Sequence, residues 1–464
     1  MILQALHDYY HRMQAEGLVD LASEGFERKG IPFLLVLNRE GRFLDLQDTR
    51  LQEGPRKVAR EFIVPMAVKK TIGIAANVLW GPSSYVFGRS KPEPNKDPAK
   101  FLDRTRKQKE RFLNTIQERL IAVLDDEGVA AVVSFLQREE FDNVFAHPSW
   151  PEIEEKGRLL TFQLNSDNCI VCERPQVVAA IKSNMTIGQD QQACLITGKI
   201  DESARLHTAI KGVKGAQPSG ANIISFNLPA FTSYGKQQSY NAPVGKRAEF
   251  AYTTALNHLL KRDSSQRLLV GDTTVAYWAE QKHDIEGVFA ELFGEPAKGE
   301  PEQDYRQLAA LFRSPEAGIP PEHNPDTRFF VLGLSPNAAR LAVRFWYAGS
   351  VREVADHLWQ HFDDLELAKD LKEWRSISIK NLLRSIVHQG KDENIPPNLA
   401  GDTMKAILLG MPYPQTLLVT AIRRCRAERE ITYTRAALIK AVLVRDNRSE
   451  KRYSNHQTKE VGMS

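Results

Sequence analysis

Several features that define common protein classes are scarce or missing in this chain of 464 residues. Four cysteines are too few for a disulfide framework at this length, which favours reduced thiols in a cytosol. No apolar run approaches the roughly 20 residues that span a bilayer. The N-terminus also lacks the basic and apolar regions of a signal peptide. We therefore expect a cytoplasmic protein with no membrane partner.

Catalytic motifs are missing as well. The sequence has no P-loop, no HExxH pair, no GxSxG elbow and no GxGxxG after a predicted strand. This absence favours a binding protein over an enzyme, so we predict no catalytic residue and no cofactor. Two alternatives stay open: a metal-dependent nuclease with a dispersed acidic site, and a scaffold that binds only protein.

One set of residues has the ligand types of a structural zinc site. Cys169 and Cys172 form a CxxC, and Cys194 and His207 follow downstream. The two residues inside the CxxC are apolar and suit a strand core, and only one CxxC is present, so buried reduced cysteines are favoured. Zinc binding by these four residues stays open.

The hydrophobic pattern predicts an α+β fold with small sheets and long loops, followed by an all-helical C-terminal region. We divide the chain into an α+β region at 1–150, a β-rich region with a polar loop at 151–327, and a helical region at 328–464. Ser335 and Pro336 predict the start of a helix that continues to Phe345. On that helix Arg340 and Arg344 would lie one turn apart and point the same way.

Charge is distributed unevenly. The net charge is only +4, so contact with nucleic acid would require clustered cations. Residues 210–244, the acid-free segment, contain three lysines and no Asp or Glu. Lysines suit phosphates, while amides and hydroxyls donate to phosphate oxygens or base edges. The candidate contacts are Lys211, Lys214, Gln217, Ser219, Asn222, Lys236, Gln238 and Asn241, with Arg340 and Arg344 as further groove-lining cations.

Other features of the acid-free segment allow more than one interpretation. Its glycines would let the backbone approach a ligand closely, and its aromatic residues predict that part of it is buried. A buried strand at 222–228 between polar turns explains the pattern equally well. Basic stretches at 99–119 and 423–452 could follow a nucleic-acid backbone, although a solvated face with ion pairs is commoner for such a helix.

A second acid-free stretch covers residues 69–91 and interleaves aromatic residues with hydrogen-bond donors. Such a combination suits a duplex groove, where cations meet phosphates and an amide meets base edges. A solvated turn with Trp80 and Phe87 anchored in the core is the alternative. The candidate contacts here are Lys69, Lys70, Thr71, Asn77, Ser83, Ser84 and Tyr85.

Sequence stretches in order along nearly the whole chain resemble the large subunit of the type I-C CRISPR surveillance complex, Cascade. They include MILQALHDYYHRM at the start, IAANVLWGPSSYVFG at 74–88, CLITGKIDESARLHTAIKGVKGAQPSGA at 194–221, FFVLGLSPNAARLAVRFW at 329–346 and PPNLAGDTMKAILLG at 396–410. The family often has an acidic–amide pair after the tryptophan, where this chain has Gly81, Pro82 and Ser83. Family members also continue into a C-terminal helical bundle resembling the small subunit, which we expect to be missing, truncated or supplied separately here.

The resemblance implies a non-catalytic subunit of an RNA-guided antiviral machine. In such complexes base pairing with the guide reads most of the sequence, while protein reads the PAM, a short motif beside the target. The implied partners are CRISPR RNA, target double-stranded DNA with its displaced non-target strand, the Cascade backbone and handle-binding subunits, small-subunit helical bundles and the helicase–nuclease. The implied PAM-reading element is the 69–91 stretch, acting from the minor groove.

Overall fold

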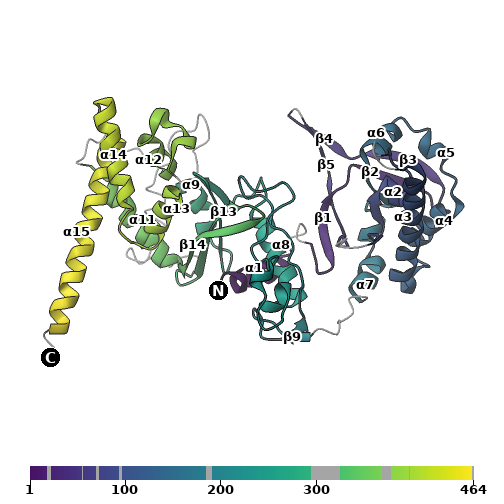
Figure 1. Cartoon of the computed structure of the whole chain (residues 1–464), viewed down its shortest axis with the longest axis horizontal. Helices are drawn as coiled ribbons and strands as arrows, with labels where there is room; N and C mark the ends of the chain where they lie inside the picture. The colour runs from purple at the N-terminus through teal and green to yellow at the C-terminus, as the bar shows by residue number, and fades with distance from the viewer. Residues whose placement is uncertain are drawn as a thin grey trace. The chain divides into compact units, whose positions relative to one another are not determined.

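The structure is a computed structural model (Figure 1) that describes residues 1–17, 22–54, 56–68, 73–92, 97–183, 191–293, 324–367, 378–396 and 398–461. The chain divides into a smaller unit, Ala22–Gly188, and a larger unit, which joins Met1–Leu21 to Gln189–Ser464. The predicted α+β class is confirmed, with helices dominating the C-terminal end. No helix among the described residues is both long enough and apolar enough to cross a membrane.

The smaller unit is built on a mixed sheet with the strand order β3-β2-β8-β7. Its central strand β2 is apolar without interruption and fully buried, because neighbouring strands and covering helices enclose both of its faces. The elements of this unit are β1 (Phe26–Gly30), β2 (Phe33–Leu37), β3 (Phe43–Asp48), β4 (Arg50–Glu53), β5 (Arg56–Ala59), β6 (Glu61–Pro65), β7 (Trp80–Pro82), α2 (Ser83–Val86), α3 (Pro98–Arg119), α4 (Glu127–Arg138), α5 (Asp142–Phe145), α6 (Trp150–Lys156), β8 (Leu159–Leu164) and α7 (Pro175–Ser183).

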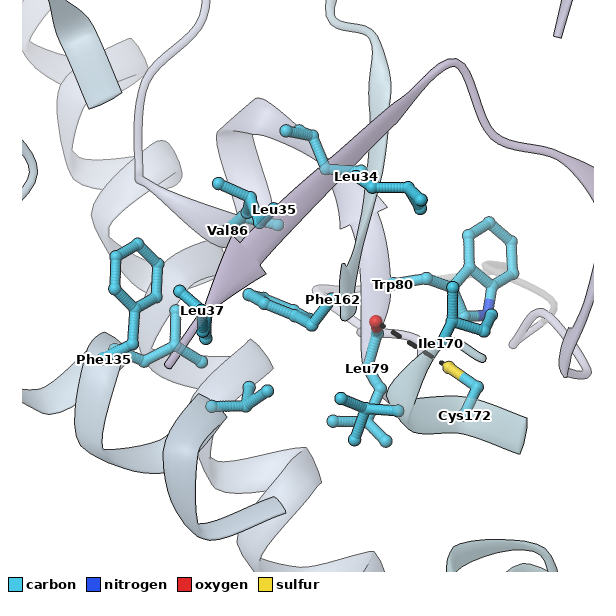
Figure 2. Packing of buried hydrophobic residues seen from close by; sticks show 14 of the residues in the cluster. Leu34, Leu35, Leu37, Leu79, Trp80, Val86, Phe135, Phe162, Ile170 and Cys172 are labelled. Atoms are coloured by element: carbon cyan, nitrogen blue, oxygen red, sulfur yellow. Dashed lines mark hydrogen bonds between the residues drawn. The ribbon is translucent and has the colours of Figure 1, made fainter. Parts of the chain in front are cut away.

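Aromatic residues fill the core between this sheet and its helices. Phe112 of α3 stacks on Phe162 of β8 with ring centroids 6.4 Å apart, and Phe135 of α4 meets the same ring at 6.4 Å. Figure 2 shows Phe135 and Phe162 beside Leu37 of β2, with Trp80 on the far side of the sheet. This core fixes β7 and the stretch that leads into it.

The larger unit holds an antiparallel sheet in the order β11-β12-β13-β14. Every residue of β12 is buried, since helices cover both faces: Tyr277 packs on Phe289 of α9, and Trp278 packs against Tyr9 of α1. The elements of this unit are α1 (Ile2–Ala15), β9 (Gln191–Ala193), β10 (Ile200–Glu202), α8 (Lys246–Leu259), β11 (Arg267–Val270), β12 (Thr273–Ala279), α9 (Ile285–Phe293), β13 (Arg328–Asn337), β14 (Arg340–Ser350), α11 (Val351–Leu365), α12 (Ile379–Ser385), α13 (Leu399–Leu408), α14 (Gln415–Glu428) and α15 (Tyr433–Val461).

The predicted helix from Ser335 to Phe345 is wrong. These residues form the β13–β14 hairpin, with a tight turn in which Ala338 has φ +53°. The aromatic run at 345–347 within β14 is better suited to a pleated surface, and pairing with β13 overrides the helical spacing. The register shifts so that Phe345 faces Gly333 and Val343 faces Leu334, which leaves Arg344 as the extra residue of a bulge. Arg340 and Arg344 therefore do not share a helix face.

The division of the chain into domains at 1–150, 151–327 and 328–464 stays a prediction. At the predicted boundary between residues 150 and 151, α6 packs into the core of the smaller unit through the buried side chains of Trp150 and Ile153. The hydrophobic pattern also predicts helices at 2–16, 127–138 and 350–363, and α1, α4 and α11 agree closely with them.

Candidate nucleic-acid interface

The acid-free segment begins with a closed backbone loop. Ile210 and Ala221 exchange two backbone hydrogen bonds of 2.9 Å each. Gly220 has φ +94°, and a Cβ there would lie 2.8 Å from the Ile210 carbonyl oxygen; a Cβ on Gly212 would lie 2.2 Å from that of Leu260. Close packing within the larger unit therefore requires both glycines, independently of any ligand.

Two of the candidate lysines are held by their backbone and leave their side chains exposed. The Lys211 N–H donates to Asn257 Oδ1 at 2.8 Å, and the Lys214 N–H donates to Thr274 Oγ1 at 2.9 Å. Lys214 Nζ also donates to the Gly271 carbonyl at 3.2 Å. These anchors come from α8 and β12, and sequence reasoning missed them because nothing in the local pattern marks them.

Asn222 joins the segment to the start of β14. Its N–H donates to the Ala339 carbonyl at 3.1 Å, and its carbonyl accepts from the Leu341 N–H at 2.9 Å. Its side-chain amide donates to the His207 carbonyl at 3.0 Å, so this group serves the fold. Residues 222–228 do not form the strand that the alternative interpretation predicted, and make only this isolated bridge.

The two arginines of β14 lie in different settings. Arg340 places its guanidinium 5.0 Å from the ring centre of Phe231, which brings it onto the acid-free segment. Arg344 Nη2 lies 3.8 Å from Asp272 Oδ2, and about a third of the Arg344 side chain is exposed (33%). The structure therefore brings Arg340 together with the segment, whereas an acid partly neutralises Arg344.

The rest of the acid-free segment is mostly at the surface. Gln217, Ser219 and Lys236 are exposed, and Gln238 and Asn241 are half-buried. Burial of part of the segment was predicted from its aromatic residues, and Phe226 and Phe231 are half-buried. Tyr234 is not, because 99% of it is exposed.

Among its described residues, the second acid-free stretch buries the side chains of Asn77, Trp80, Ser83 and Tyr85. Trp80 is buried and its Nε1 donates to the Pro65 carbonyl at 2.8 Å. Asn77 is 9% exposed, and its Oδ1 accepts from the Val68 N–H at 3.0 Å. Ser83 and Tyr85 are buried as well, whereas Ser84 is half-buried. Lys69, Lys70 and Thr71 lie outside the described residues.

This inward arrangement changes what Asn77 can do. Its carbonyl oxygen already accepts a hydrogen bond from the backbone N–H of Val68. An amide used in this way holds the backbone instead of presenting itself to a base edge. In this conformation Asn77, Ser83 and Tyr85 are not exposed for direct contact with a duplex.

The further basic stretches also use many of their charges internally. On α3, Lys107 and Arg106 both pair with Asp103, at 2.6 and 3.2 Å, and Arg111 pairs with Glu118 at 3.1 Å. On α15, Arg445 is buried and pairs with the fully buried carboxylate of Asp364 at 2.6 Å. Ion pairs on a solvated face therefore describe much of α3, and Arg445 of α15 is part of the core.

Two of the possible zinc ligands, Cys172 and His207, have other polar neighbours. Cys172 is buried beside the Leu79 carbonyl, a contact of 3.9 Å drawn in Figure 2, and burial raises the pKa of its thiol to about 12. His207 Nδ1 bonds to the Tyr252 hydroxyl. Among the described residues no group of three or more His, Cys, Asp or Glu side chains is placed to hold a metal ion.

Comparison with known proteins places the chain in a class. Residues 6–464 match the family model described as CRISPR-associated protein (Cas_Csd1). The chain is therefore a CRISPR-associated protein. It belongs to the Cas_Csd1 family, and this confirms the resemblance to a Cascade large subunit. A comparison with curated proteins finds no match.

Proposed function

We propose that the chain is a non-catalytic nucleic-acid-binding large subunit of a type I-C Cascade, which acts in antiviral defence in the cytoplasm. Its work would be to recognise the PAM, to stabilise the R-loop and to help recruit the helicase–nuclease. The observation that carries the proposal is the acid-free segment, which has an anchored backbone and exposed cations in a chain of the Cas_Csd1 family. Neither protein packing nor solvation alone requires a run of 35 residues without one carboxylate.

The nucleic-acid surface would consist of the exposed side chains of this segment. Lys211, Lys214 and Lys236 suit phosphates, and Gln217 and Ser219 suit phosphate or sugar oxygens. Asn222, Gln238 and Asn241 are less exposed and are better suited to holding the segment in shape. Arg340 would add a guanidinium beside Phe231, and Arg344 a weaker charge beside Asp272.

The PAM would be read by the 69–91 stretch. Lys69, Lys70, Thr71 and Ser84 are the proposed contacts, because Asn77, Ser83 and Tyr85 support the stretch from within. Lys70→Ala should then weaken binding to all duplexes similarly and flatten the salt dependence by about one unit. Lys156→Ala is the matched control, since Lys156 is an exposed lysine of the same unit that lies outside the 69–91 stretch.

The experiment that tests the function is a salt series with the purified chain. Retention of PAM-containing and scrambled duplexes should fall steeply with salt, because the released counterions come from phosphate contacts. The same DNA incubated with Mg²⁺ or Mn²⁺ should stay intact until a helicase–nuclease is added. Reproducible cutting that co-purifies with the chain would favour the nuclease alternative, and salt-insensitive or absent retention would favour the scaffold.

A further inference from the structure

A tight turn at the surface of the acid-free segment carries a tyrosine in an unusual setting. Ser233 and Lys236 pair across the turn, and the Lys236 N–H donates to the Ser233 carbonyl at 2.9 Å. The two residues between them both have positive φ, +50° for Tyr234 and +72° for Gly235. Positive φ at both central positions is the signature of a type I′ turn.

The side chain of Asn241 stabilises this turn through three hydrogen bonds to backbone groups. Asn241 Oδ1 accepts from the Ser233 N–H at 3.0 Å. Its Nδ2 donates to the carbonyls of Lys236 at 2.9 Å and Gln238 at 2.8 Å. The side-chain amide of Asn241 therefore uses its acceptor and both of its donors on three backbone groups, and these hydrogen bonds fix the conformation of the turn.

Neither the backbone nor the packing explains why the first central residue is a tyrosine. Asn, Asp and Gly are preferred at that position of a type I′ turn, and a bulky residue with positive φ is strained. Tyr234 recovers nothing through burial, because 99% of it is exposed. A single exposed apolar residue is ordinary on a protein surface, but one held at positive φ on a braced turn indicates an external partner.

The surroundings of the ring indicate the chemistry of that partner. The exposed neighbours are Thr232, Ser233, Gly235, Lys236 and Gln237, which are polar and include one cation and no acid. A protein interface usually has an apolar core of several residues inside a polar rim, whereas the residues flanking this ring are polar. An aromatic face beside a cation fits an unpaired nucleotide, whose base stacks on the ring while its phosphate meets the ammonium.

We propose that Tyr234 is a stacking platform for an unpaired base of a single-stranded nucleic acid, with Lys236 on the adjacent phosphate. A duplex does not fit this role, since its bases already stack on one another. The displaced DNA strand and the guide RNA both offer unpaired bases, and separate DNA and RNA arms distinguish them. The proposal rests on the nucleic-acid-binding function proposed above and names the ligand class for one part of that surface.

The test uses the full chain with short single-stranded DNA and RNA probes that carry one 2-aminopurine. Tyr234→Ala should weaken binding about 5- to 150-fold and leave the salt dependence unchanged, because stacking is not ionic. Tyr234→Phe should retain the affinity, and Lys236→Ala should flatten the salt dependence by about one unit. Wild-type binding should quench the 2-aminopurine, and an abasic probe should bind the wild type and Tyr234→Ala alike.

Trp359→Ala is the matched control, since Trp359 is an exposed aromatic residue (43%) outside the segment and outside the basic stretches. If the wild type binds these probes and Tyr234→Ala binds them equally well, the stacking proposal is wrong and the proposed function stands. If the wild type retains no nucleic acid, both are wrong. If Tyr234→Ala binds normally but no longer co-purifies with the other subunits, the tyrosine is a protein contact and the proposal is overturned.

Discussion

The two acid-free stretches have similar compositions but use their polar groups in opposite ways. In residues 73–92 the Trp80 indole and the Asn77 amide bond to backbone groups of the same unit. In residues 210–244 the backbone is anchored instead, and Lys211 and Tyr234 are left exposed. Composition can indicate that polar partners exist. It cannot tell whether they are external molecules or the chain's own backbone.

The largest expected contrast is in stability. Trp80→Ala removes a buried indole and its hydrogen bond to Pro65, so it should lower the free energy of unfolding by about 3–5 kcal/mol. Tyr234→Ala removes an exposed ring and should change it by less than about 0.5 kcal/mol. Urea unfolding of the two variants measures the difference. Equal losses would mean that the two aromatic residues are buried to a similar extent and would remove the contrast.

The next contrast is in assembly and strand binding. The double variant Lys211→Glu with Lys214→Glu places negative charge against phosphate. It should reduce incorporation into the guide-RNA complex, or R-loop formation, by roughly tenfold or more, because the loss of several phosphate contacts lowers affinity by orders of magnitude. Co-purification with the backbone subunits and permanganate footprinting of the opened target measure these two effects.

The control for this double reversal changes the net charge of the chain by the same amount at other positions. Lys391→Glu with Lys405→Glu reverses two exposed lysines of the same unit that lie outside the acid-free segment. This control should assemble normally. If the Lys211 and Lys214 variant also assembles and opens DNA normally, the segment is not part of the functional surface.

The sequence predicted much of this architecture and misplaced one important element. The helix at the N-terminus followed from apolar residues at helical spacing, and Leu6, Tyr9 and Met13 are indeed buried. Residues 335–345 were misassigned because their spacing also fits a strand, and the pairing with β13 that decides between them is not local. The direction in which Asn77 points was equally hidden, since it depends on how Val68 and β7 come together in the assembled unit.

Asn77 offers a smaller and more specific test of the contrast. Asn77→Ala leaves the Val68 N–H without its acceptor, which should lower the free energy of unfolding by about 1–3 kcal/mol. Asn241→Ala, which frees the exposed turn, should affect stability less and single-strand binding more. Unfolding is compared with affinities for PAM and scrambled duplexes. If Asn77→Ala instead keeps its stability and loses about 1–3 kcal/mol of PAM discrimination, the amide meets a base edge directly.

The smallest expected effect is a difference between the two units in how their stability depends on pH. His361 is buried in the larger unit, and burial, with the charge of Arg445 nearby, lowers its pKa to about 3. In the smaller unit, hydrogen bonds from Arg50 lower the pKa of Glu152 to about 2. Both folded pKa values lie below the unfolded ones, so each contribution to stability is lost as the pH falls. The loss begins near the unfolded value, 6.5 for the histidine and 4.5 for the glutamate.

At pH 5.5 the larger unit should therefore have lost about 1.4 kcal/mol relative to neutral pH, because one pH unit separates that value from the unfolded histidine pKa. The contribution of Glu152 should still be intact at this pH. Hydrogen exchange at pH 7.5 and 5.5, corrected for the intrinsic rate, resolves peptides from α11 and from β8 separately. His361→Gln cannot gain the proton and should remove the loss around α11, whatever its stability at neutral pH. An equal loss in both units, or one that survives in His361→Gln, would show that another group controls the acid response and that the units do not differ in this way.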